Sequence, residues 1–179
     1  MKNYLAHKTA EISPKAVIGK NTKIWHYCHI RENVKIGDNC ILGRNVYVDF
    51  GVTIGNNCKI QNNCSIYHGT TIEDGVFIGP HVVFANDKIP RAITPDGKLK
   101  TDKDWVIGKI HVKYGASIGA NSVILSNVII GRFAMIGAGS VVTKNVPNFA
   151  LAYGNPVHLH GVINKEGKTV KKTIQKKRL

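Results

Sequence analysis

An aliphatic or aromatic side chain recurs every six residues over most of this chain, and no other feature constrains the fold as strongly. The series runs unbroken from Ile12 to Phe84, begins again at Val106 and continues to Val142. A fixed short period is typical of a solenoid, in which each turn packs only on its neighbours. The interval 85–105 is therefore predicted to be an insertion into a regular column.

The fourth position of each repeat is Asn or Gly almost throughout. These residues adopt left-handed backbone angles at lower cost than others, so this position predicts a corner. His81 takes the fourth position of its own repeat, and because His also tolerates such angles we interpret it as a structural corner. The Asn and Gly corners are Asn21, Asn33, Asn39, Asn45, Gly51, Asn57, Asn63, Gly69, Gly75, Gly115, Asn121, Asn127 and Gly139.

Short strands joined by corners, without any reversing connection, fit a prism with three faces. Successive coils of about 18 residues would pair as parallel strands, and six to seven coils would form a column roughly 30 Å tall. The fifth position is small or β-branched and should point inward beside the aliphatic residue. All four cysteines occupy it, which predicts core side chains rather than zinc ligands; they are Cys28, Cys40, Cys58 and Cys64.

Composition and charge bound the function. Hydrophobic residues make up 43% of the 179 residues, enough for a core, and the formal net charge of +14 favours acidic partners such as nucleic acid, anionic lipid or phosphorylated small molecules. We expect a soluble cytoplasmic protein, since no N-terminal leader and no membrane-spanning apolar run is found. Much of the basic excess lies late in the chain, where a solvated tail is favoured over a nucleic-acid arm: Lys165, Lys168, Lys171, Lys172, Lys176, Lys177 and Arg178.

The insertion contains two prolines, one glycine and scattered charges, which argue against a helix or a strand. A segment of this length without regular structure is usually a functional loop or disorder. His68 precedes a corner glycine at a similar height in the column, so it is the better histidine candidate for a site. Trp25 and Arg31 replace the usual glycine at position two and should project outward. There they could bind a base or a phosphate, or a neighbouring subunit could cover Trp25.

The repeat resembles that of the left-handed β-helix acyltransferases over nearly the whole chain. The resemblance implies the left hand, a homotrimer with sites between subunits, and acetyl-CoA as co-substrate without a metal. We therefore predict an all-β left-handed parallel β-helix domain over 1–156, with the loop 85–105 inserted, and a basic appendage over 157–179. Stacked Gly-Ala steps resemble the acetyl-CoA groove of the family, and nearby cations are candidates for its phosphates: Gly119, Ala120, Gly137, Ala138, Arg132 and Lys144.

A narrower resemblance lies in the segment 84–92, preceded by Ile24-Trp25-His26 and followed by 115–121. It is similar to bacterial sugar-nucleotide N-acetyltransferases that act on the 3-amino group of a UDP- or dTDP-linked aminosugar in glycan precursor synthesis. In that family the loop asparagine lies near the amine and the thioester, which implies this role for Asn86. The Asn-Asp pair found here is more typical of dTDP-deoxysugar members. The resulting candidates are Asn86 and His68 for catalysis, and Asp87, Arg91, Tyr67, Trp25 and Arg31 for substrate binding.

The chemistry of the acceptor separates the alternatives. A neutral amine held near a thioester needs oxyanion donors rather than a strong base, whereas a hydroxyl acceptor needs a base, which the maltose and galactoside O-acetyltransferases supply as a loop histidine. The interval 85–105 has no histidine, which favours an amine, with His68 as an assisting group. The alternatives are a sugar O-acetyltransferase, a γ-type carbonic anhydrase with three zinc-binding histidines, and a non-enzymatic scaffold or nucleic-acid binder.

Overall fold

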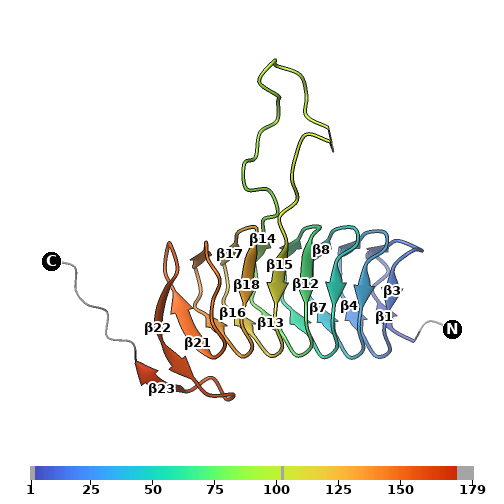
Figure 1. Ribbon diagram of the computed structural model, residues 1–179. Helices are drawn as coiled ribbons and strands as arrows, with labels where there is room; N and C mark the ends of the chain where they lie inside the picture. The colour runs from blue at the N-terminus through green and yellow to red at the C-terminus, as the bar shows by residue number, and fades with distance from the viewer. Residues whose placement is uncertain (1–2, 102, 173–179) are drawn as a thin grey trace.

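The computed structural model describes residues 3–101 and 103–172, and in these ranges every regular element is a β-strand. The strands form a column of stacked coils (Figure 1). They are grouped into three sheets, called A, B and C here, and the chain visits the sheets in that order in every coil. This is the predicted all-β parallel β-helix of hexapeptide repeats, consistent with the left hand that the resemblance implies.

The strands are short, and their bounds repeat the six-residue period. Sheet A contains β1 (Leu5–Ala6), β4 (Lys23–Ile24), β7 (Ile41–Leu42), β10 (Lys59–Ile60), β13 (Phe77–Ile78), β16 (Ser117–Ile118), β19 (Met135–Ile136), β21 (Ala150–Tyr153), β22 (His158–Ile163) and β23 (Thr169–Lys172). Sheet B contains β2 (Glu11–Ile12), β5 (His29–Ile30), β8 (Tyr47–Val48), β11 (Ser65–Ile66), β14 (Val83–Phe84), β17 (Val123–Ile124) and β20 (Val141–Val142). Sheet C contains β3 (Val17–Ile18), β6 (Lys35–Ile36), β9 (Thr53–Ile54), β12 (Thr70–Ile72), β15 (Ile110–Val112) and β18 (Val128–Ile130).

Each strand pairs in parallel with the strand one coil further on, as Ile60 does with Ile78 and Ile66 with Phe84. Sheet A holds 8 consecutive parallel strands, from β1 to β21, so the column is slightly longer than the predicted six to seven coils. The reason is that both ends take part in the pairing. Strand β1 pairs with β4, and β21 pairs with β19 although the repeat has faded there.

The corners have the predicted backbone conformation. Every Asn and Gly expected at a corner has a positive φ, from 56° at Asn39 to 88° at Gly69, and His81 has a φ of 60°. Tyr27, Phe133 and Phe149 adopt the same angles, between 53° and 58°. A rule based on Asn and Gly could not find these three, because an aromatic residue pays a steric cost there that its neighbours must offset.

The core is the stack of aliphatic residues inside the prism. From Ile24 to Val142 the residues at the repeated aliphatic position are buried, apart from Val106, and Phe84 is among the largest fully buried side chains. The four cysteines are buried between coils and are free thiols, as predicted. Ile12 and Ile18 are only partly buried because they belong to the first coils.

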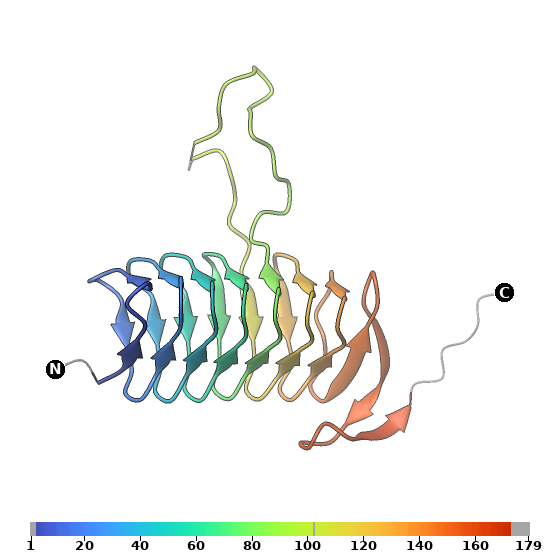
Figure 2. The same cartoon turned by 180° about the vertical axis from the view of Figure 1, so that it is seen from behind.

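The insertion begins and ends two residues later than predicted. Val106 does not restart the register: it is 87% exposed, and the next strand is β15, whose Val112 pairs with Ile72. The loop closes at a bridge between Asp87 and Ile107. It re-enters the column at Gly108, where a Cβ would lie 2.3 Å from the Ser126 Cβ, so only glycine fits. We call residues 87–107 the arm, which stands away from the column in Figures 1 and 2.

Beyond β21 the chain turns back as an antiparallel hairpin. Strand β22 pairs with β21, and β23 pairs with β22, at the opposite end of the column from β1 (Figure 2). The basic appendage therefore forms a hairpin around residues 165–167, described as far as residue 172. The last basic residues, Lys176, Lys177 and Arg178, lie outside the described residues. Within 3–101 and 103–172 no helix is long and apolar enough to cross a membrane.

The corner rule can be tested at Asn57, which is exposed and has a φ of 57°. We expect Asn57→Ala to lower the free energy of unfolding by about 1 kcal/mol, because a Cβ-bearing residue without an amide is disfavoured at left-handed angles. Asn57→Gly should lower it less, and Thr53→Ala on an exposed strand position is the matched surface control. Urea unfolding followed by circular dichroism measures the differences. Equal losses for the Ala and Gly variants at residue 57 would contradict the rule.

Candidate active site

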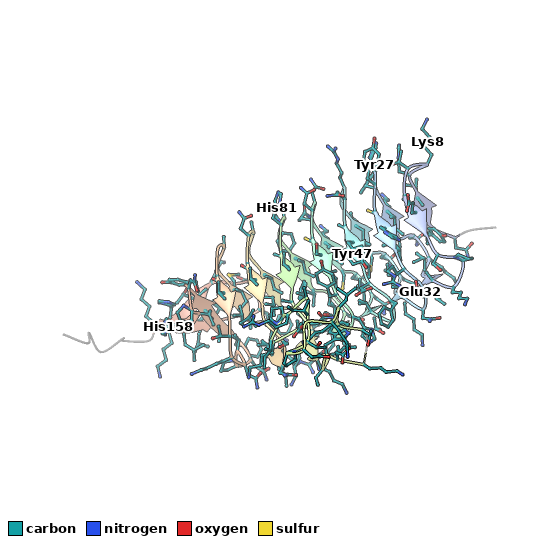
Figure 3. All side chains as sticks on the ribbon, turned by 90° about the horizontal axis from the view of Figure 1, so that it is seen from above. Lys8, Tyr27, Glu32, Tyr47, His81 and His158 are labelled. Atoms are coloured by element: carbon teal, nitrogen blue, oxygen red, sulfur yellow. The ribbon has the colours of Figure 1, made fainter. Side chains whose placement is uncertain are left out.

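The candidate site residues divide among the three edges of the prism, which we name by the sheets that they join. The A–B edge carries Trp25, Gly119, Ala120, Gly137 and Ala138; the B–C edge carries Arg31, Tyr67, His68, Asn86 and Lys144, with Asp87 and Arg91 on the arm that leaves from it; the C–A edge carries Arg132. Figure 3 shows Tyr27 and His81 of the A–B edge on the other side of the column from Glu32 of the B–C edge. One protomer therefore does not bring all the predicted residues together.

The structure places Asn86 and His68 in direct contact on the B–C edge. Asn86 follows β14 and is only 9% exposed, and its side-chain Nδ2 donates to the His68 carbonyl oxygen at 3.0 Å. This bond spans 18 residues, one coil of the column. No hydrogen bond in the described ranges uses the side-chain oxygen of Asn86, so an acceptor group is available at the root of the arm.

The ring of His68 is held on two sides by Phe50, one coil below. Its Nδ1 lies 2.8 Å from the Phe50 carbonyl oxygen, and the two rings stack with centroids 3.9 Å apart and an interplanar angle of 13°. Because a carbonyl oxygen can only accept, Nδ1 carries the proton in the neutral ring and Nε2 keeps its lone pair. His68 therefore presents a proton acceptor whose orientation the coil below determines.

Asp49, which was not among the predicted site residues, connects the other polar groups of this edge. Asp49 is 7% exposed, and its Oδ1 accepts from Arg31 Nη1 at 2.9 Å and from the Tyr47 hydroxyl at 3.1 Å. Burial, and to a smaller extent the nearby Asp49 carboxylate, raises the pKa of Tyr47, so the phenol remains a donor. A signal was present: an acidic residue stands at position two, where glycine is usual, one coil from Arg31 in one direction and from Tyr67 in the other.

Arg31 is engaged within the protomer. Its Nη2 lies 2.7 Å from Glu32 Oε1 and its Nη1 lies 2.9 Å from Asp49 Oδ1, and the guanidinium lies over the Phe50 ring. Two carboxylates already compensate its charge, so Arg31 is less suited to bind a substrate phosphate than its position suggested. Tyr67, by contrast, is 37% exposed beside Tyr47, with ring centroids 5.6 Å apart, and remains available for contact.

The root of the arm encloses a cavity of about 370 Å³ on the side of the arm that faces Ser126. Asp87 lines it, and a second cavity shares Asp87 with Arg91. The side chain of Asp87 also accepts from the Ile89 N–H at 2.8 Å, which shapes the start of the arm. The lining of the first cavity combines charges of both signs with apolar and neutral polar groups: Asp87, Lys88, Ile89, Lys100, Asp104, Trp105, Val106, Ser126 and Asn127.

The Gly-Ala steps of the A–B edge stack as predicted, and they leave backbone donors free. A Cβ at Gly119 would lie 2.4 Å from the Ala138 nitrogen, so glycine permits this close approach of coils. Lower on the same edge the Asn62 side chain accepts from the Arg44 N–H at 2.8 Å. Alanine has no such acceptor, and the Ala120 and Ala138 N–H groups have no partner within 3–101 and 103–172. They can donate to the amide-bearing arm of a ligand.

Three predicted residues lie apart from these groups. Trp25 is on the A–B edge but in an early coil, where it is 40% exposed and stacks beside His26. Arg132 lies over the Tyr114 ring on the C–A edge, at 5.4 Å. Lys144 is exposed on the B–C edge, beyond the arm. Within one protomer the predicted phosphate partners are thus on different edges from the Gly-Ala steps.

The carbonic anhydrase alternative needs three converging histidines. His81 lies on the A–B edge, while His111 lies on sheet C and pairs with Glu73 at 2.7 Å. In the part of the chain that the structure describes, no three His, Cys, Asp or Glu side chains are grouped as metal ligands would be. The geometry therefore does not support a zinc site of that kind.

The β-helix fold and the stacked Gly-Ala pairs are those of a hexapeptide-repeat transferase. Comparison with protein families gives the same class. The chain matches the family described as bacterial transferase hexapeptide (six repeats) over residues 15–49, 51–86 and 111–144, and the gap after residue 86 contains the arm. A hexapeptide repeat of succinyl-transferase matches 33–68. The chain belongs to the hexapeptide-repeat transferase family.

Individual members of the family are similar to this chain in sequence or in fold. A stretch of 56 residues, 31% of this chain and 29% of the relative, is 61% identical to dTDP-3-amino-3,6-dideoxy-alpha-D-galactopyranose 3-N-acetyltransferase of Aneurinibacillus thermoaerophilus. The chain spans less than half the length of the curated relatives that it matches. A mutant of the N-acyltransferase AntD from Bacillus cereus, in complex with dTDP and coenzyme A, is 25% identical, with a TM-score of 0.57 over 92% of this chain and 84% of that one. An acetyltransferase from Vibrio cholerae, complexed with acetyl coenzyme A, is 27% identical, with a TM-score of 0.54 over 69% of this chain and 70% of that one.

The hydrogen bonds predict different tautomers for two histidines. We expect neutral His68 to carry its proton on Nδ1, because Nδ1 faces the Phe50 carbonyl. His160 should carry its proton on Nε2, since this atom lies 3.2 Å from the Tyr153 carbonyl oxygen. Long-range proton–nitrogen NMR correlation at alkaline pH distinguishes the two forms. Finding His68 protonated on Nε2 would show that the ring is not held as described.

Proposed function

We propose that this protein is an acetyl-CoA-dependent N-acetyltransferase that acts on the 3-amino group of a nucleotide-linked aminosugar. The observation that carries the proposal is the Asn86–His68 contact at the root of the arm, at 3.0 Å. It holds the Asn86 amide against the backbone of His68, and it leaves the amide oxygen free to meet an acceptor. The relative with 61% identity over its matched stretch is an acetyltransferase of a dTDP-linked 3-aminosugar, which supports this substrate class and favours dTDP.

The protein needs mainly to hold the amine close to the thioester and to stabilise the charge that develops during the reaction. The neutral amine forms a C–N bond to the thioester carbonyl carbon, the C–S bond breaks, and the proton lost by nitrogen passes to the departing thiolate or to solvent. The free Asn86 oxygen can accept a hydrogen bond from the amine and so aim its lone pair. A backbone N–H at the site can meet the oxyanion, and His68 Nε2 can assist the loss of the proton.

We infer that the complete site forms between copies of the chain, in a homotrimer. Asn86 and His68 lie on the B–C edge, whereas the free N–H groups of Ala120 and Ala138 lie on the A–B edge, and sheet B separates the two edges. If the pantetheine arm runs along the Ala120 and Ala138 backbones, its thioester can meet Asn86 only across a contact between two protomers. Because both co-substrates are products of intracellular metabolism, the proposal places the reaction in the cytoplasm.

One observation supports a second candidate function. His68 has a lone pair on Nε2 and a fixed ring, which is what a general base for a hydroxyl acceptor requires. A sugar O-acetyltransferase is therefore the alternative. The two functions differ in acceptor and in their dependence on His68.

The direct test is thiol release from acetyl-CoA in the presence of a panel of UDP- and dTDP-linked 3- and 4-aminosugars. We expect turnover with a 3-aminosugar, fastest with a dTDP-linked one, and none with sugars that offer only hydroxyl groups. Turnover restricted to hydroxyl acceptors would establish the O-acetyltransferase instead. No turnover with any acceptor, together with salt-sensitive RNA binding, would favour a non-enzymatic β-helix.

The roles of the two central residues predict unequal losses. Asn86→Ala should reduce kcat about a hundredfold, because the amine loses its orienting acceptor. His68→Ala should reduce kcat only about tenfold, because an amine does not depend on a strong base. His111→Asn, on sheet C and away from both edges, is the control and should behave as wild type. Complete loss of activity in His68→Ala, with recovery at high pH, would make histidine the essential base and contradict this mechanism.

A further inference from the structure

Four hydrogen-bond donors converge on the carboxylate of Asp49, one coil below His68. Arg31 Nη1 at 2.9 Å and the Tyr47 hydroxyl at 3.1 Å donate to its Oδ1. The Phe50 N–H at 2.9 Å donates to the same oxygen, and the His68 N–H at 3.1 Å donates to Oδ2. A carboxylate can only accept, so it satisfies all four, whereas an amide would turn a donor toward one of them.

These bonds fix both sides of the His68 ring. The Asp49 carboxylate accepts from the backbone N–H of His68 and from the backbone N–H of Phe50, so it holds both backbones. Phe50 in turn accepts from His68 Nδ1 at 2.8 Å and supplies the ring on which the imidazole stacks. The direction of His68 Nε2 therefore depends on a carboxylate that does not touch the imidazole.

The fold alone does not call for a charge at this position. On the other two edges position two is often glycine, as at Gly37, Gly43 and Gly55, where an added Cβ would meet the next coil within 2.8 Å. On the B–C edge this position is taken by larger residues, Asp49 among them. Burying a carboxylate costs free energy unless it is fully partnered, and a partnered pair seldom improves on an uncharged residue. Asp49 is 7% exposed and uses Arg31 and Tyr47 as partners, so its presence is better explained by what it holds.

We propose that Asp49 is a positioning residue of the acetyl-transfer site and that it acts through His68. The proposal rests on the proposed function and deepens it. It states that Asp49, which does not touch the imidazole, sets the orientation of His68. Arg31 then serves to neutralise Asp49 rather than to bind phosphate.

The test compares Asp49→Asn with Asp38→Asn, measured with the acceptor found in the panel. Asp38 is a matched control: its carboxylate accepts a single backbone N–H, from Lys20 at 2.7 Å, and Asn56 and Asn62 fill the same role elsewhere. We expect Asp49→Asn to lower kcat about tenfold, as His68→Ala does, with little change in KM, because orientation rather than binding is lost. Asp38→Asn should keep wild-type kcat.

A double-mutant cycle separates positioning from a general loss of stability. If Asp49 acts through His68, Asp49→Asn should have almost no further effect on kcat in the His68→Ala background. An equal loss in both backgrounds, or no loss in either, overturns the proposal. Tyr47→Phe removes one donor without removing the charge; it should lower kcat about twofold in wild type and not in His68→Ala. If Asp49→Asn fails to fold, the effect of Tyr47→Phe in the two backgrounds tests the positioning role of Asp49 instead.

The NMR signal of the His68 Nδ1 proton gives a readout independent of catalysis. It should be protected in the wild type and in Asp38→Asn, and exchange rapidly with solvent in Asp49→Asn. An unchanged signal in a folded Asp49→Asn overturns the proposal. Absence of turnover in the wild type would instead contradict the proposed function, while the signal would still report whether Asp49 orients the ring.

Discussion

The whole column depends on a left-handed backbone angle at one residue in six. That angle turns the chain from one face of the prism to the next, and it is what allows strands of two or three residues to stack in register with those of the next coil. The corner residue also donates its N–H to a carbonyl one coil earlier, as Asn57 does to Asp38 at 2.8 Å. Conformation and hydrogen bonding are thus satisfied together at most corners, and the aliphatic core follows from their regularity.

The edges differ because the residues beside the corners differ. On the C–A edge and the lower A–B edge, Asn and Asp side chains cap the backbone of the coil below, so the polar groups are used up, as at Asp38 and Asn62. The upper A–B edge has alanines, and its N–H groups stay free. The B–C edge has no glycine at position two in the coils from Arg31 to Ala85, and there a network links Asp49 to His68. Free donors and polar networks are thus found where the regular capping stops.

The arm also leaves the column from the B–C edge, where the regular capping stops. It leaves the column directly after Asn86, above His68, and returns at the only kind of residue that can pass beneath Ser126. The insertion therefore does not interrupt a random turn of the solenoid. It adds a cavity lined by charges of both signs and by Trp105 on the side that faces Ser126, while the free backbone donors lie across sheet B. The proposed homotrimer would bring these two sets of groups together from neighbouring copies.

The sequence by itself determined the period, the corners, the inward-facing cysteines and the place of the insertion to within two residues, because each of these depends on residues close together in the chain. It also indicated His68, from its place before a corner glycine near the break in the repeat, while the role of Asn86 came from the resemblance of segment 84–92 to a known family. What only the tertiary structure decided is how side chains one coil apart meet. The four donors around Asp49, the proton on His68 Nδ1 and the engagement of Arg31 by Glu32 and Asp49 all depend on stacking distances and rotamers. Val106 continued the pattern and yet lies outside the column, since the point of re-entry is set by the space beneath Ser126 and not by hydrophobic spacing.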